Sequence, residues 1–169
     1  MGWSLLIFAA IAAVATAYFY AVGPKTVWRQ MYGSPDLGPF LLADLKRNTR
    51  PNDALLCTPG ACPHSVEVDG ELASFDVPPE DMLQKVIASA SELSVDIEAV
   101  ESGTSTGSVR FVTWTPGLGF PDTNQFWAVT LPDGKTGLVA YARAQVGYSD
   151  QGNNLARLKK WTSMLTEAD

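Results

Sequence analysis

Hydrophobic and polar positions separate the chain into one uninterrupted apolar segment and a longer region of alternating pattern. Residues 3–22, WSLLIFAAIAAVATAYFYAV, carry no charge, and 20 such residues are enough to cross a bilayer core as a helix. Gly23 and Pro24 then end the helix. We expect a transmembrane anchor over residues 1–23.

The alternative for this segment is a cleaved secretory signal peptide, because the sequence ATA at residues 15–17 resembles a cleavage site. The apolar run continues beyond that sequence, however, and no Lys or Arg precedes it, so a retained anchor is favoured. Aromatic residues suit the two interfaces of a bilayer near its ends: Trp3 at one, and Tyr18, Tyr20 and Trp28 at the other.

Apolar residues recur at helical spacing in two later segments. The first begins after the Pro-Pro-Glu-Asp sequence at residues 78–81, where proline is tolerated and acidic side chains favour the positive end of the helix dipole. Its apolar face comprises Met82, Leu83, Val86, Ile87, Ala90 and Leu93. The second segment covers residues 153–168, with Leu155, Leu158, Met164 and Leu165 on one side.

Segments of alternating or β-branched residues predict strands at 73–77, 94–101, 108–115, 125–131 and 136–146. Asp133-Gly134 predicts a tight hairpin turn between the last two strands, and further turns or loops are expected at residues 103–107 and 116–124. Strands joined by short turns pair antiparallel. The order of strand, helix, four strands and helix predicts an α+β domain, an antiparallel sheet with two helices packed on one face.

Charge differs between the region after the anchor and the rest of the chain. Residues 24–50, an extended neck interrupted by prolines, hold five basic and two acidic side chains, whereas residues 51–169 carry a net charge of −9. An acidic domain repels phosphates, so we expect no nucleic-acid partner. The basic neck is expected to rest on anionic headgroups of the lipid bilayer or on an acidic partner. A solvated linker is the alternative.

Two features make opposite predictions about the side of the membrane. Lys25 and Arg29 follow the anchor and, by the positive-inside rule, draw this flank into the cytoplasm. The two cysteines, Cys57 and Cys62, flank a Pro-Gly pair that suits a type II turn, and so favour a disulfide in an oxidising compartment. Unpaired thiols, or a metal site with His64, are the alternatives. We expect an extracytoplasmic domain.

The sequence GYSDQGNNLARL at residues 147–158 lies between the last predicted strand and the last helix. Its glycines allow backbone angles that other residues resist, and Asp150 or Asn153 can cap the helix. One interpretation is a structural corner in which Arg157 pairs with Asp150. The other is a ligand site built from Asp150, Asn154 and Arg157. The motif residues are Gly147, Ser149, Asp150, Gly152, Asn154 and Arg157.

Together with the sequence RPN at residues 50–52 and the preceding YARAQV, this motif resembles the signature of the DUF1499 family of bacterial, often membrane-anchored or exported proteins. The resemblance covers residues 40–168. Ala144 and Gln145 depart from the pattern, which has serine and arginine at these positions. The resemblance implies export, and hence a domain on the periplasmic side of the bacterial inner membrane, but no particular reaction.

Motifs for catalysis are absent from the sequence, which has no phosphate loop, no G-x-S-x-G nucleophile turn and no H-E-x-x-H zinc helix. A hydrolytic triad would need the single histidine, His64, which lies in a proline-containing loop. We therefore expect no catalytic residue, no cofactor and no metal site.

Aromatic residues of the strands are candidates for docking a partner. Phe126 and Trp127 are neighbours on one strand and point to opposite faces, so we expect some of Trp114, Phe126 and Trp127 on a docking surface. A sheet with both faces covered is the alternative. The favoured function is a non-catalytic accessory or assembly subunit of a larger inner-membrane, possibly energy-transducing, complex. A small-molecule or lipid-binding module, indicated by a deep apolar pocket, is the second hypothesis, and a hydrolase the third.

Overall fold

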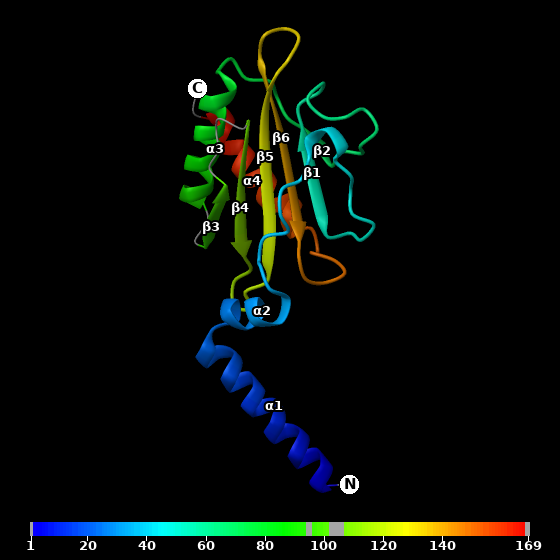
Figure 1. Cartoon of the computed structure of the whole chain (residues 1–169), viewed down its shortest axis with the longest axis vertical. Coiled ribbons are helices and arrows are strands. Elements are labelled where there is room, and N and C mark those ends of the chain that lie inside the picture. Colours follow the sequence, from blue (N-terminus) through cyan, green and yellow to red (C-terminus); the bar gives the residue numbers. More distant parts are fainter. Residues whose placement is uncertain (1, 94–95, 102–106, 168–169) are drawn as a thin grey trace.

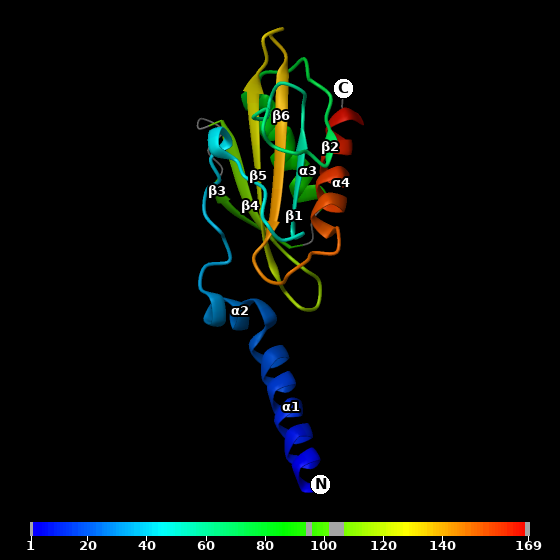
Figure 2. The same cartoon turned by 90° about the vertical axis from the view of Figure 1, so that its right-hand side faces the viewer.

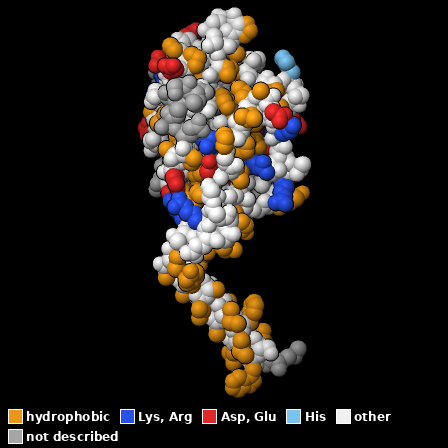
Figure 3. Space-filling view, viewed as in Figure 1, with side chains coloured by type: hydrophobic (Ala, Val, Ile, Leu, Met, Phe, Trp, Pro, Cys, Tyr) orange, Lys and Arg blue, Asp and Glu red, His pale blue; other side chains and the backbone are white. Residues whose placement is uncertain are grey.

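The computed structural model describes residues 2–93, 96–101 and 107–167. The first helix, α1 (Gly2–Val22), projects from the rest of the chain (Figure 1). It carries exposed apolar side chains (Figure 3). Its length and composition are sufficient to cross a membrane. Gly23 separates it from α2 (Pro24–Tyr32), a helix that occupies the first part of the predicted extended neck.

Six strands form one mixed sheet in the order β2-β1-β6-β5-β4-β3. The strands are β1 (Asp53–Cys57), β2 (Gly70–Glu71), β3 (Ile97–Glu101), β4 (Ser108–Trp114), β5 (Pro121–Thr130) and β6 (Thr136–Ala144). All neighbouring pairs are antiparallel except β1 and β2. The predicted α+β class is therefore confirmed. Within the described residues, the parallel β1–β2 pair at one edge is the departure from the predicted antiparallel order.

The helices α3 (Pro79–Leu93) and α4 (Asn153–Glu167) cover the same face of the sheet (Figure 2), as their apolar periodicity predicts. Their buried residues pack with the sheet into one core: Met82, Leu83, Val86 and Ala90 from α3, and Leu158, Trp161 and Leu165 from α4. Ser89 Oγ of α3 donates a hydrogen bond of 2.9 Å to the carbonyl of Trp161, which joins the two helices.

The opposite face of the sheet is covered by residues 34–45, which we call the strap (Figure 2). Buried polar side chains of β5 bind its backbone. The amide of Leu37 donates to Oγ1 of Thr123 at 2.9 Å, and the amide of Phe40 donates to Oε1 of Gln125 at 2.8 Å. The second half of the predicted neck is therefore packed on the domain, because the sheet supplies the hydrogen-bond partners that its extended backbone needs.

One ion pair and one hydrogen bond fix the strap near its start. Asp36 pairs with Arg110 of β4 at 3.1 Å. The side chain of Arg110 is only 8% exposed. Gln145, one of the positions that depart from the family pattern, donates from Nε2 to the carbonyl of Ser34 at 2.7 Å. The strap is thus held by β4, β5 and the segment after β6.

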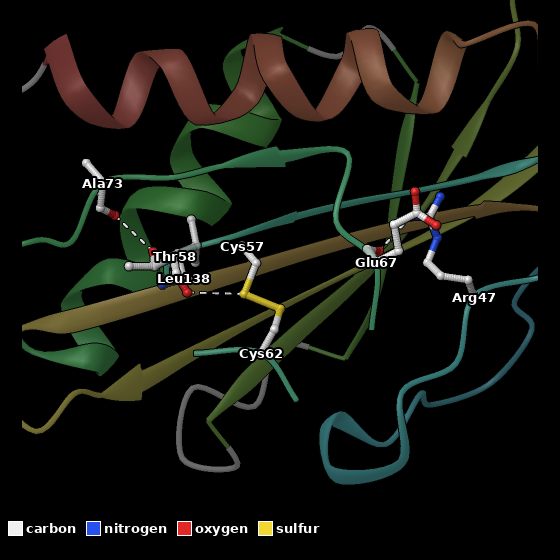
Figure 4. Close-up of a disulfide and its surroundings, with 7 residues drawn as sticks. All are labelled: Arg47, Cys57, Thr58, Cys62, Glu67, Ala73 and Leu138. Carbon is white, nitrogen blue, oxygen red and sulfur yellow. Dashed lines mark hydrogen bonds between the residues drawn. A yellow bond between two sulfur atoms is a disulfide. The ribbon is translucent and has the colours of Figure 1, made fainter. Parts of the chain in front are cut away.

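Beneath the strap lies a second core that contains the predicted disulfide. It comprises Leu45, Leu55, Cys57, Ala61, Trp127, Leu131, Val139 and Tyr141. Cys57 at the end of β1 and Cys62 in the following loop form a disulfide with an S–S distance of 2.14 Å (Figure 4). This confirms the disulfide prediction. Figure 4 also shows Arg47, which donates to the carbonyl of Glu67 at 2.9 Å.

Several strand predictions were wrong in position. Residues 73–77 contribute only a single bridge, between Phe75 and Thr136, while β1 and β2 lie where no strand was predicted. The strand β5 begins at Pro121, inside the predicted loop 116–124. The predicted positions 94, 95, 103–106 and 168 lie outside the described residues.

Candidate functional site

The closing motif forms the corner that leads from β6 into α4. Gly147 and Gly152 have φ angles of +99° and +79°, which only glycine adopts without strain. The carboxylate of Asp150 accepts hydrogen bonds from the backbone amides of Gly152 at 3.3 Å and Asn154 at 2.7 Å, and Ser149 Oγ accepts another at 3.1 Å. The prediction that Asp150 caps the helix is confirmed.

Asn154 and Asn52 join this corner to the start of β1. Asn154 is fully buried, and its Nδ2 donates to the carbonyl of Asn52 at 3.1 Å. Asn52 in turn donates to the carbonyls of Ala144 and Gly147, both at 3.3 Å. The RPN sequence and the closing motif, whose two asparagines are 102 positions apart, form one hydrogen-bonded unit. These bonds give both segments a structural role.

Arg157 pairs with Asp122 of β5, so the predicted ion pair between Arg157 and Asp150 is wrong. Its Nη1 lies 3.0 Å from Oδ2 of Asp122, its Nε donates to Asn124 at 3.0 Å, and its Nη2 donates to Asn154. Asp150 instead uses its oxygens for the amides at the start of α4. The guanidinium therefore connects β5 to α4 beneath the helix.

Asp122 is a buried carboxyl group whose side chain is 4% exposed. Burial raises the pKa of Asp122 above its ordinary value of 3.8, and the charge of Arg157 lowers it only in part. The nearby charge of Asp150 raises it further. Desolvation therefore outweighs the salt bridge at this position.

The helix α2 is attached to the domain through basic and acidic side chains, which meet at the lower edge of the domain in Figure 3. Lys25 pairs with Asp96, and Arg29 with Glu98; all four side chains are 41–46% exposed. The two cations also lie over the ring of Trp114, at 5.2 and 5.4 Å from its centroid. Lys25 and Arg29, two of the five neck cations that were expected to bind headgroups or a partner, thus have acidic partners within the chain.

Trp28 completes this junction between α2 and the domain. Its Nε1 donates to the carbonyl of Leu118 at 2.6 Å, and its ring centroid lies 4.9 Å from that of Phe120. Trp28 therefore binds the domain, in addition to lying near the end of α1. The other aromatic residues predicted at a bilayer interface are each more than half exposed: Trp3, Tyr18 and Tyr20.

A cavity of about 960 Å³ lies at the same junction. Its walls come from the turn between α1 and α2, the end of β4 with the loop that follows it, and one side of α4. The lining is mainly apolar and includes the rings of Trp114 and Trp161. This volume falls within the range of small-molecule sites, about 300–1,000 Å³. The charged residues of the lining are Lys25, Asp96, Arg157 and Lys160.

The cavity is positive although the chain as a whole has a net charge of −6. Its three basic side chains stand against the single carboxylate of Asp96. Lys25 is paired with Asp96, and Arg157 with Asp122. Lys160 is exposed and has no acidic partner among the described residues. One ammonium group at the cavity therefore remains available to an anion.

Trp114 contributes a hydrogen-bond donor that the fold does not use. The residue is 5% exposed, and its indole N–H is buried with no acceptor anywhere in the described chain. Buried indole N–H groups ordinarily have a partner, and leaving one unsatisfied costs about 1–3 kcal/mol. An unsatisfied donor on a residue that lines a cavity indicates a binding site better than it indicates packing alone.

The predicted docking aromatics are buried, so the prediction of an exposed aromatic surface is wrong for these three residues. Trp114 and Trp127 are 5% and 7% exposed, and Phe126 is fully buried. Phe126 and Trp127 do point to opposite faces, but the helices cover one face and the strap covers the other. The alternative prediction, a sheet with both faces covered, is the one that holds.

The sequence carried a signal for the cavity that was overlooked. Asn153, Ala156, Arg157, Lys160 and Trp161 all line it, and their spacing of three and four residues places them on one side of α4. Apart from Ala156, this set is polar or aromatic, and it adjoins the apolar core face of the helix.

Comparison with known proteins found no match among protein-family models, curated proteins or solved structures. The resemblance of the RPN sequence and the closing motif to the DUF1499 family stays a prediction.

Proposed function

We propose that this protein is a single-pass, membrane-anchored binding module that holds a lipid chain or another apolar small molecule in the junction cavity. The observation that carries the proposal is the cavity itself. It measures about 960 Å³, it is mainly apolar, and its wall includes Trp114 with an unsatisfied indole N–H. A concave apolar site with a few polar groups is the usual form of a small-molecule site.

The position of the cavity supports a ligand that comes from the bilayer. Tyr20 and Pro24, at the end of α1 and the start of α2, form part of its wall. With α1 inserted as an anchor, the cavity lies at the level of the headgroups, where a lipid chain can enter without crossing water. The Cys57–Cys62 disulfide supports an extracytoplasmic domain, because such bonds persist in oxidising compartments.

The two other hypotheses have less support. An accessory role in a larger inner-membrane complex stays a prediction, and the three aromatic residues that suggested docking are buried. A hydrolase would be favoured by a carboxyl group of raised pKa beside Arg157 in a cleft. Asp122 has this raised pKa, but its side chain is 4% exposed, it bonds to Arg157, and it does not line the cavity. A structural role accounts for it.

Photocrosslinking in lipid nanodiscs tests the binding function on the full chain. Two diazirine-labelled probes of equal chain length, a fatty acid and a monoacylglycerol, are presented in phosphatidylcholine nanodiscs. We expect at least one to label peptides that line the cavity. Ala156→Trp fills the cavity from an exposed helical position and should abolish that labelling. Ser163→Trp, on the same helix but outside the lining, is the matched control.

Failure of both probes to label the cavity, or equal labelling of the wild type and the Ala156→Trp variant, would refute the proposed function. Circular dichroism of both tryptophan variants verifies that each is folded, which separates a blocked cavity from a lost domain.

A further inference from the structure

We infer that the ligand of the junction cavity is an anionic single-chain amphiphile, whose tail lies among the apolar residues and whose acidic headgroup binds Lys160 and Arg157. This inference rests on the proposed function and specifies its ligand class. A carboxylate and a phosphate share the relevant chemistry, since both present charged acceptor oxygens to N–H donors.

The first argument is the local charge. The cavity carries three basic side chains and one acidic side chain, whereas residues 51–169 have a net charge of −9. An anion is therefore repelled by most of the domain and attracted at the cavity, where Lys160 has no acidic partner among the described residues. A neutral ligand can accept hydrogen bonds from these donors but lacks the charge that strengthens them.

The second argument is the supply of free donors. A guanidinium has five N–H donors, and the bonds of Arg157 to Asp122, Asn124 and Asn154 use three of them. The ammonium group of Lys160 has no acidic partner among the described residues and lies one helical turn from Arg157. An acidic headgroup can accept hydrogen bonds from both side chains without breaking the salt bridge between Arg157 and Asp122.

The third argument is the arrangement of polar and apolar groups on α4. Arg157, Lys160 and Trp161 line the same cavity at adjacent positions of one helical face. A ligand whose head binds the two cations therefore has its chain beside the Trp161 ring. Trp114, at the end of β4, also lines the cavity and provides further aromatic surface and the unsatisfied indole N–H. A volume of about 960 Å³ suits one drug-sized ligand, which corresponds to one chain with a compact head.

The same two photoprobes test this inference, because they share the chain and differ in the headgroup, which is an anionic carboxylate in one and a neutral glycerol ester in the other. We expect the fatty acid to label the cavity at about one-tenth of the concentration that the monoacylglycerol needs, since one charge-assisted hydrogen bond corresponds to about tenfold in affinity. Lys160→Glu should remove this preference for the fatty acid. Lys159→Glu makes the same charge change at the neighbouring position, which does not line the cavity, and should behave as wild type.

The outcomes separate the inference from the function on which it rests. Equal labelling by the two probes, or a preference that survives Lys160→Glu, overturns the ligand class and leaves the binding function intact. Labelling by neither probe overturns both. Displacement of the fatty acid by millimolar inorganic phosphate would show that a free anion suffices for recognition, and this too overturns the amphiphile.

Discussion

At Asp122, burial and a neighbouring cation act on one carboxyl group in opposite directions. Because the folded-state pKa is raised above 3.8, the folded chain binds this proton more readily than the unfolded chain does. The stabilising contribution of this protonation is therefore fully present below pH 3.8 and is lost as the pH rises through the folded-state pKa. Most carboxylates in salt bridges have the opposite dependence.

Neighbouring charges should move the pKa of Asp122 in predictable directions. Arg157→Gln removes the charge that lowers it, so we expect the pKa to rise further. Asp150→Asn removes a charge that raises it, so we expect the pKa to fall. Carboxyl-carbon NMR across a pH series measures both shifts. A pKa that is unchanged in both variants would mean that burial alone sets its value.

Residue-scale chemistry was only partly predictable from the sequence. Asp150 as a helix cap follows from local spacing, because a cap and the amides it binds lie within four residues. The partner of Arg157 could not be predicted from local spacing, because Asp122 is 35 positions away and becomes a neighbour only when α4 packs against β5. Local spacing favoured Asp150, which is closer in sequence but already bonded to backbone amides.

At the scale of elements, a buried ion pair between Asp36 and Arg110 is one of the contacts that hold the strap. Asp36→Ala removes a carboxylate from Arg110, whose side chain is 8% exposed, and we expect a loss of about 3 kcal/mol in the free energy of unfolding. Asp44→Ala, in the same strap, breaks a pair with Lys46 whose side chains are 69% and 77% exposed, and should cost less than about 1 kcal/mol. Urea unfolding of the full chain in detergent compares them.

Similar losses in the two strap variants would contradict the assignment of the strap to the folded domain. If the neck were detached and solvated, Asp36→Ala and Asp44→Ala would lower the free energy of unfolding equally, because neither aspartate would then be buried.

Elements were predictable where the sequence carries a local signal, such as a helix with one solvent-exposed face or a tight turn. The helix α3 and the β5–β6 hairpin follow from a 3.6-residue periodicity and an Asp-Gly turn. The strand β1 gave no alternation, because Ala54 to Cys57 are buried on both faces of the sheet. The start of β5 was missed for the opposite reason: Asp122, Thr123 and Asn124 are polar, as in a loop, yet almost fully buried.

At the scale of the whole molecule, the attachment of α2 to the domain depends mainly on Trp28, because the two ion pairs beside it are half-exposed. Trp28→Ala should leave the melting temperature of the domain unchanged and increase tryptic cleavage after Lys25 and Arg29 about tenfold through local opening. Met31→Ala changes an exposed residue of the same helix and should leave cleavage at the wild-type rate. Equal cleavage in both variants would contradict this role for Trp28.

The strap has a consequence for the order in which the protein forms during synthesis. It is translated early, yet the side chains that hold it belong to β4 and β5, and the sheet beneath it is completed only by β6, which ends at Ala144. At ribosomal rates of about 5–20 residues per second, the strap emerges roughly 5–20 seconds before the strand that completes its binding surface. During that interval the sheet against which Phe40, Leu42 and Leu45 of the strap pack is incomplete. The strap therefore reaches its final position only after strands that lie about 100 residues further along the chain have been made.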